Sequence, residues 1–152
     1  MNKSDFIAQA PKAAIKAGAL LGVDPLIIVA QAALESGWGE HTPKPDSGHG
    51  ESYNFYGIKA DNGWRGPTSG GHWTTIQGKF RAYSSLEAGF VGYSEFIHDN
   101  PRYRHALAVA GDPEAYLKAL QQAGYATDPD YAAKVLAVWR KLSQHVEGEA
   151  HG

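Results

Sequence analysis

Apolar residues recur at helical spacing toward both ends of this chain, with an interruption in the middle. The first helical stretch covers residues 4 to 21 and stops at Gly22, and Pro11 is expected to kink or shorten it. The second begins with Asp24 as N-cap and Pro25 as the first helical residue. This second stretch is apolar on nearly every side, which predicts a helix inside the core.

Helical spacing resumes at Ser84-Ser-Leu-Glu87, a capping-box pattern, and that helix is expected to end at Asn100-Pro101. Two Asp-Pro pairs then open the last two long helices, and the final one has Tyr131 on its buried side. A frayed, flexible tail is expected at residues 147 to 152. The helices expected in this half of the chain lie at residues 84–100, about 103–109, 112–124 and 128–146.

The helical period is absent between residues 37 and 79. Gly, Pro, Ser, Asn and aromatic residues dominate there, with short candidate strands at about 54–59 and 73–77. No internal repeat, low-complexity segment or linker divides the chain, and 152 residues with 43% hydrophobic content suffice for one core. The pattern predicts a mainly helical α+β domain, residues 1 to 146, with one small β insertion.

Composition excludes several classes of function. A net charge of −2 gives no broad positive field, so no nucleic-acid partner is expected. There is no Cys, which excludes disulfides and thiolate chemistry. No apolar run is long enough to span a bilayer and none resembles a signal peptide, so we expect neither membrane insertion nor export by that route. The seven His residues show no metal-binding register, and no metal or other cofactor is predicted.

One carboxylate, Glu35, lies near the end of the apolar second helix. Apolar surroundings disfavour the charged form of an acid, so such a group tends to keep its proton near neutral pH and can act as a general acid. The following Ser36-Gly-Trp-Gly39 ends the helix and supplies an aromatic surface of the kind that stacks on sugars. The structural alternative is a solvated Glu in a last helical turn, with Trp38 as a core residue.

Several motifs occur in the order found in one enzyme family. They are Ala30-Gln-Ala-Ala-Leu-Glu-Ser-Gly-Trp-Gly39, Tyr53-Asn-Phe-Tyr-Gly-Ile-Lys-Ala60, Phe80-Arg-Ala-Tyr83, Asn100-Pro-Arg-Tyr103 and Ala123-Gly-Tyr-Ala-Thr-Asp-Pro-Asp-Tyr131. The chain thereby resembles glycoside hydrolase family 73, the flagellar-rod-type peptidoglycan hydrolases with N-acetylglucosaminidase activity, over roughly residues 4 to 142. The resemblance implies a lysozyme-like fold, in which a cleft separates a helical lobe from a small β-lobe.

The resemblance also implies roles for individual residues. Glu35 matches the catalytic glutamate that protonates the leaving glycosidic oxygen. Tyr125 matches a tyrosine near that glutamate, whose hydroxyl would position water or the acetamido group of the substrate. Four residues match the aromatic and amide groups that line the cleft and are expected to bind substrate, although each also fits a structural role: Trp38, Asn54, Phe55 and Tyr56.

The chain departs from this family at the second acid. Family members commonly carry an acidic residue in the β-lobe before the Phe-Arg-x-Tyr segment, whereas residues 62–86 contain no Asp or Glu, and the β-lobe is shortened. Asp46, Glu51 and Asp61 are the nearby candidates, and each is more typical of a solvated loop. Glu35 is therefore expected to act with a tyrosine-held water and a loop carboxylate, or with the substrate's own acetamido oxygen.

The function predicted from the sequence is endo-β-N-acetylglucosaminidase activity on the β-1,4 bonds of bacterial peptidoglycan. A muramidase or lytic transglycosylase is the alternative of the same chemistry, and an inactive peptidoglycan-binding module is the alternative of another class. The expected partner is the glycan strand, bound by a monomer in the periplasm or cell wall. A phage lysin released by a holin, an injected effector and an excised domain all fit this expectation.

Overall fold

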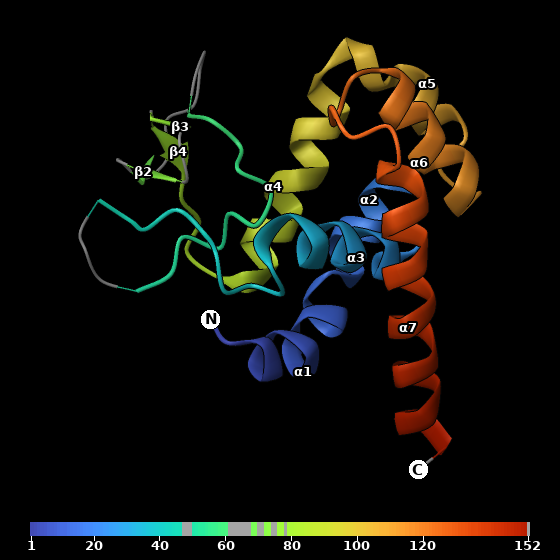
Figure 1. Ribbon diagram of the computed structural model, residues 1–152, viewed down its shortest axis with the longest axis horizontal. Helices are drawn as coiled ribbons and strands as arrows, with labels where there is room; N and C mark the ends of the chain where they lie inside the picture. The colour runs from blue at the N-terminus through green and yellow to red at the C-terminus, as the bar shows by residue number, and fades with distance from the viewer. Residues whose placement is uncertain (47–49, 61–67, 70–71, 74–75, 78, 152) are drawn as a thin grey trace.

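A computed structural model describes residues 1–46, 50–60, 68–69, 72–73, 76–77 and 79–151 (Figure 1). Its first half contains α1 (Lys3–Ala13), α2 (Ile15–Leu21), α3 (Pro25–Ser36), β1 (Thr68–Ser69), β2 (His72–Trp73), β3 (Ile76–Gln77) and β4 (Phe80–Arg81). Its second half contains α4 (Leu86–Asp99), the 3₁₀ helix η1 (Pro101–Tyr103), α5 (Arg104–Ala108), α6 (Pro113–Gln122) and α7 (Tyr131–His151).

Helix α3 lies at the centre of the core and packs along α7 (Figure 1). The Asp24 side chain accepts a hydrogen bond from the Leu26 amide at 2.9 Å and Pro25 occupies the first turn, which confirms the predicted start. Gly37, with φ of 59°, ends the helix in the left-handed conformation that glycine adopts without steric cost. The helix is buried on nearly every side, at Ile27, Ile28, Val29, Ala30, Gln31, Ala32, Ala33 and Ser36.

The predicted first helix is two helices, and the break lies at Ala14 instead of Pro11. Pro11 stands inside α1, and the Ala14 amide still donates to the Ala10 carbonyl at 3.0 Å. The expected apolar face is nevertheless buried across both helices, including Phe6 and Ala17. The change of direction at Ala14 therefore keeps one continuous apolar surface against the rest of the core.

The β part consists of two small antiparallel pairs, β1 with β4 and β2 with β3. The expected strand at 54–59 is wrong apart from an isolated bridge between Lys59 and Phe80. The Asn54 side chain donates to the Ile58 carbonyl and accepts from the Ile58 amide, while backbone hydrogen bonds from Arg81 to Ile58 and from Ala60 to Lys79 tie the end of this segment to the chain around β4. The expected strand at 73–77 is instead part of the β2–β3 hairpin, with residues 74–75 outside the described part of the chain.

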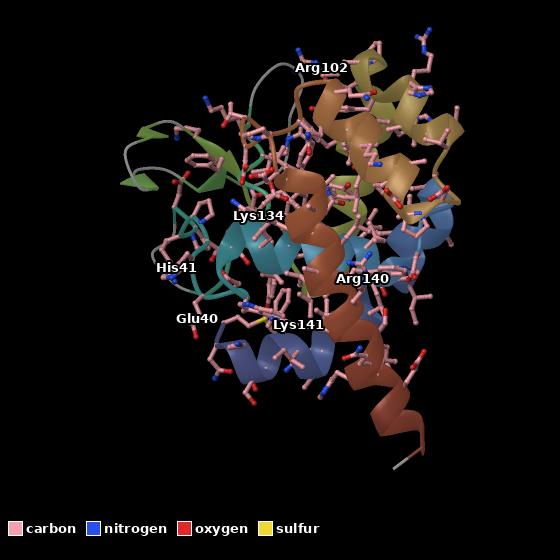
Figure 2. The ribbon with its side chains drawn as sticks, turned by 45° about the vertical axis from the view of Figure 1, so that its right-hand side comes forward. Glu40, His41, Arg102, Lys134, Arg140 and Lys141 are labelled. Carbon is pink, nitrogen blue, oxygen red and sulfur yellow. The ribbon has the colours of Figure 1, made fainter. Side chains whose placement is uncertain are left out.

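The helices of the second half of the chain differ from the prediction at their ends. Ser85, one residue later than the capping-box pattern suggests, caps α4 by accepting from the Ala88 amide at 3.1 Å. Helix α7 continues to His151, so residues 147–151 of the segment expected to be a frayed tail are helical, and residue 152 lies outside the described residues. Figure 1 shows the β pairs on the opposite side of the molecule from α7. The exposed side of α7 bears basic side chains, labelled in Figure 2 at Lys134, Arg140 and Lys141.

Within the described residues, no helix taken singly has the length and apolar composition to cross a bilayer, although α2 and α3, bent by 111° at their junction, pass that test as a pair.

Candidate active site

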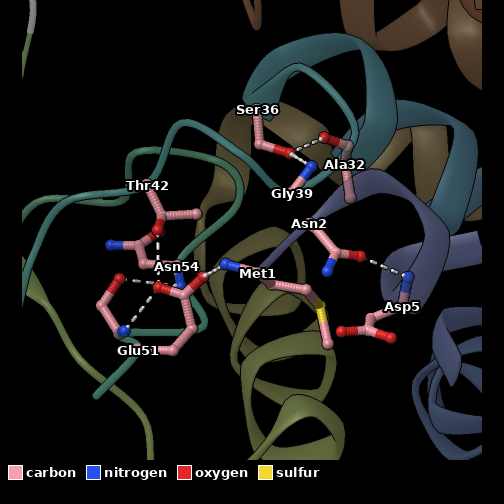
Figure 3. A network of polar contacts seen from close by, with 10 residues as sticks. Met1, Asn2, Asp5, Ala32, Ser36, Gly39, Thr42, Glu51 and Asn54 are labelled. Carbon is pink, nitrogen blue, oxygen red and sulfur yellow. Dashed lines mark hydrogen bonds and ion pairs between the residues drawn. The ribbon is translucent and has the colours of Figure 1, made fainter.

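Glu35 occupies the last turn of α3 and lines a cavity of about 300 Å³. The neighbouring Ser36 fixes the end of the helix, because its hydroxyl donates to the Ala32 carbonyl at 2.6 Å and accepts from the Gly39 amide at 2.8 Å (Figure 3). Aromatic rings form much of the cavity wall. The lining residues are Glu35, Tyr56, Gly57, Ile58, Lys59, Phe96, Tyr103 and Tyr125.

Two tyrosines donate hydrogen bonds to the Glu35 carboxyl group. The Tyr125 hydroxyl lies 3.1 Å from Oε2 and 3.3 Å from Oε1, and the Tyr131 hydroxyl lies 3.1 Å from Oε2. Tyr125 follows Gly124, whose φ of 84° turns the chain after α6, and Tyr131 is the first residue of α7. The structure thus brings the two predicted catalytic residues, Glu35 and Tyr125, into direct contact.

Burial dominates the electrostatics of this carboxyl group. The surrounding protein removes most of the water around it and raises the pKa of Glu35 from 4.5 to about 8, while the hydrogen bonds from Tyr125 and Tyr131 act in the opposite direction. Burial also raises the pKa of the Tyr125 and Tyr131 hydroxyls well above 10, so both remain neutral donors. Glu35 is therefore protonated near neutral pH, as a general acid must be.

Tyr56 lies in the cavity wall, where the sequence placed a substrate-binding residue. Its hydroxyl donates to the Ile28 carbonyl of α3 at 2.9 Å, and its ring centroid lies 4.4 Å from that of Tyr93. Because both contacts fix the ring, Tyr56 presents a rigid apolar surface next to Glu35.

Asn54 and Phe55, which the sequence predicts to bind substrate, are fully buried in this structure and do not line the cavity. The Asn54 amide donates to the carbonyls of Ile58 and Arg81, both at 2.9 Å, and accepts from the Ile58 amide at 3.0 Å. Phe55 packs between Phe6 and Phe90, with centroids 5.5 Å from each. These two residues shape the segment that carries Tyr56 instead of binding a ligand themselves.

Trp38, also predicted to bind substrate, is half-buried and does not line the cavity around Glu35. Its φ of 60° continues the left-handed conformation of Gly37, the residue that ends α3. The ring packs edge-on against Phe6, with centroids 6.3 Å apart, and the Lys3 ammonium group lies 4.8 Å from its centroid. These contacts fit the structural alternative for Trp38, and its contact with substrate stays a prediction.

The candidates for a second acid are held elsewhere or lie outside the described residues. Glu51 binds the Met1 ammonium group at 3.3 Å and accepts from the Thr42 hydroxyl at 2.6 Å (Figure 3). Asp46 forms an exposed ion pair with Lys79 at 3.7 Å, and Asp61 is outside the described residues. In the described part of the chain, Glu35 is the one acidic residue that lines the cavity.

Four further residues contribute to this site without having been predicted to do so. Tyr131 was assigned to the buried side of its helix, and the structure shows that it also donates to Glu35. Phe96 and Tyr103 line the cavity, and the amphipathic spacing of their helices gave no sign of it. Lys59 adds a positive side chain to the wall. No group of three or more metal-ligating side chains is found among the residues that the structure describes.

Glycosidic bonds break when the leaving oxygen receives a proton, and sugar rings bind against aromatic surfaces. An acid that remains protonated near neutral pH, with aromatic rings around it, places this domain among the glycoside hydrolases. The chain belongs to the glucosaminidase family, described as mannosyl-glycoprotein endo-beta-N-acetylglucosaminidase, whose model matches residues 11–144.

Sequence similarity to individual proteins supports the same family. The chain is 40% identical over 156 residues to peptidoglycan hydrolase FlgJ of Pseudomonas aeruginosa, covering 97% of this chain and 39% of that one. It is 34% identical over 128 residues to exo-glucosaminidase LytG of Bacillus subtilis, covering 77% of this chain and 43% of that one. The chain thus spans less than half the length of these relatives.

The solved structure of the glycoside hydrolase domain of Salmonella typhimurium FlgJ is also similar. It has a TM-score of 0.84 and 39% sequence identity, covering 99% of this chain and 94% of that one. The predicted family and the predicted lysozyme-like, mainly helical fold are confirmed.

Proposed function

We propose that this domain is an endo-β-N-acetylglucosaminidase that hydrolyses the β-1,4 glycosidic bonds of bacterial peptidoglycan, with Glu35 as the general acid. The observation that carries the proposal is the position of Glu35: a carboxyl group with its pKa raised to about 8, in a cavity of aromatic rings. The relatives named peptidoglycan hydrolase and exo-glucosaminidase support the choice of polymer and sugar.

The first step is proton transfer from Glu35 to the leaving glycosidic oxygen as the bond to the anomeric carbon breaks. Positive charge then develops on the sugar ring. Tyr125, which is close to Glu35 and lines the cavity, is placed to position either the attacking water or the acetamido group of the sugar. Glu35, left as a carboxylate, is stabilised by the hydroxyl donors of Tyr125 and Tyr131.

The group that stabilises the developing charge is a further part of the proposal. Because Glu51 is held by Met1 and Thr42, and Asp46 by Lys79, we infer that the acetamido oxygen of the substrate takes this role. Asp61 is the loop carboxylate that competes with this assignment. If Asp61→Asn abolishes hydrolysis while the protein stays folded, the loop-carboxylate mechanism replaces the substrate-assisted one.

The first test is mass spectrometry of the fragments that the protein releases from purified peptidoglycan. Fragments ending in reducing N-acetylglucosamine are expected, and Glu35→Gln should abolish them. Glu40→Gln, an equally neutralising change at an exposed residue nearby, is the matched control and should leave release intact.

Other products identify other functions. Reducing or anhydro-muramic ends would indicate the muramidase or lytic transglycosylase alternative. Binding to peptidoglycan without release of fragments would indicate the inactive binding module. Undiminished release by Glu35→Gln would refute the role of Glu35 itself.

The substrate also fixes the proposed place of action. Peptidoglycan lies in the periplasm or cell wall, so we place activity there, with the protein acting as a monomer on glycan strands.

A further inference from the structure

A line of buried hydrogen bonds connects Glu35 to the centre of the protein. It starts at Tyr116 of α6, whose hydroxyl lies 2.7 Å from that of Tyr93 of α4. The Tyr93 hydroxyl donates to Oε1 of Gln31 at 2.5 Å. Gln31, one helical turn before Glu35 on α3, uses Nε2 to donate to the Tyr131 hydroxyl at 2.9 Å, and Tyr131 donates to Glu35. Tyr93, Tyr116 and Gln31 are fully buried.

These hydrogen bonds all point in one direction. A tyrosine hydroxyl has a single proton to donate. Since Tyr93 gives its proton to Gln31, the donor between Tyr116 and Tyr93 is Tyr116. Since Tyr131 accepts from the Gln31 amide, its own proton is available for Glu35. Each group therefore donates to the next one, and the line ends at the carboxyl group.

The two oxygens of Glu35 differ as a result. Oε2 accepts from both Tyr131 and Tyr125 at 3.1 Å, whereas Oε1 has a single, longer contact of 3.3 Å to Tyr125. In a neutral carboxylic acid the oxygen that accepts hydrogen bonds is the carbonyl oxygen, and the other one carries the proton. We propose that Gln31 is a positioning residue that fixes Tyr131 as a donor and thereby keeps the acid proton of Glu35 on Oε1.

The orientation of the Gln31 amide decides this outcome. With its oxygen and nitrogen exchanged, the amide would accept from Tyr131, and the lone pairs of Tyr131 would then face Glu35. The acid would have to donate its proton to Tyr131, into the core and away from the cavity. In the structure the Tyr93 hydroxyl donates to the Gln31 oxygen, so the reversal would require Tyr93 to accept from the Gln31 amide and to donate to Tyr116 instead.

Other polar groups near Glu35 are unchanged by a substitution at position 31. Tyr56 and Lys59 approach from the segment after Glu51, Tyr103 from η1, and Tyr125 from the turn after α6. Gln31 itself does not line the cavity. Its replacement therefore tests the line of donors without altering the substrate-binding wall.

The inference rests on the proposed function, and its test uses the full chain with soluble glycan strands as substrate. Gln31→Met keeps the side-chain length and removes both amide groups. We expect kcat to fall about threefold to tenfold, as for the loss of a buried hydrogen bond, with KM unchanged. The high-pH limb of the kcat profile should move to higher pH, because weaker donation to the carboxylate raises the pKa of Glu35.

Tyr93→Phe is the second variant and removes the donor that orients Gln31. It should change kcat and the pH profile in the same direction. Ser94→Ala is the matched control, since Ser94 is buried beside Tyr93 and its hydroxyl donates to the Val91 carbonyl. It should behave as the unmodified protein. If Gln31→Met does not fold, Tyr93→Phe alone decides the inference.

A readout independent of catalysis separates this inference from the proposed function. The ¹³C resonance of the Glu35 carboxyl carbon, assigned by its loss in Glu35→Gln, reports the pKa of that group directly. A higher pKa in Gln31→Met and Tyr93→Phe supports the inference even if no glucosaminidase product is found. An unchanged titration in the folded variants, or a fall in kcat with an unmoved pH profile, overturns it.

Discussion

Replacing Glu35 by glutamine should stabilise the folded protein while abolishing its activity. Folding transfers a carboxyl group with an ordinary pKa of 4.5 into a site where the pKa is about 8. Above pH 4.5 the unfolded chain loses this proton while the folded protein keeps it, so the folded state is penalised as pH rises. Glutamine has a similar shape, accepts from the same tyrosines and does not titrate.

The size of the effect follows from the two pKa values. One pH unit is worth about 1.4 kcal/mol, so the interval from 4.5 to pH 7 gives an upper limit of about 3.4 kcal/mol. Because the Glu35 side chain is partly exposed to the cavity, we expect about 2 kcal/mol at pH 7. The advantage of Glu35→Gln should be small near pH 4, grow up to about pH 8 and remain constant above it.

Urea denaturation followed by circular dichroism between pH 4 and 9 measures this difference. Glu40→Gln is the control, since an exposed carboxylate loses little by folding. A difference in unfolding free energy between Glu35→Gln and the unmodified protein that does not vary with pH would refute the raised pKa. So would a variant that is less stable than the unmodified protein at pH 8.

Further predictions concern the other residues of the site. Hydrolysis of glycan strands should decline as pH rises through about 8, because Glu35 must be protonated, and a pH profile of kcat checks this. Tyr125→Phe should lower kcat about 10- to 100-fold in steady-state kinetics, with unfolding unaffected beyond about 1 kcal/mol. Tyr56→Ala should raise KM, whereas Trp38→Ala should leave it within about twofold, because only Tyr56 lines the cavity. Asn54→Ala should cost about 1–3 kcal/mol in urea denaturation, since the Ile58 amide loses its acceptor and the two hydrogen bonds that the buried Asn54 side chain donates are also lost.

Much of the helical framework was predictable because its signals are local. Asp24 and Asp112 accept hydrogen bonds from amides two and three residues ahead, as their position before proline indicates. The failure at Pro11 has a physical reason. Proline removes one amide donor but is tolerated in this helix, and the change of direction at Ala14 depends on packing against α3 and α4.

The candidate site was predictable only in part. Glu35 was identified because an isolated acid on an apolar helix has few structural explanations. Trp38 and Phe55 could not be assigned, since an aromatic residue suits both a core and a sugar site, and tertiary packing decides between them. Tyr131 was missed for the converse reason. A tyrosine on the buried side of a helix is typical of core packing. Its position in the helical pattern does not show which group its hydroxyl contacts.

The two tyrosines explain why burial does not make Glu35 too weak an acid. Burial alone favours the neutral form so strongly that the group would release its proton poorly. A lysine or arginine in place of either tyrosine would add a full charge and hold the group ionised at neutral pH. A neutral hydroxyl, whose own pKa is raised by the same burial, donates to the carboxylate without adding charge. Tyr125 and Tyr131 therefore lower the pKa by a limited amount, and the acid stays protonated at neutral pH yet close enough to it to transfer its proton.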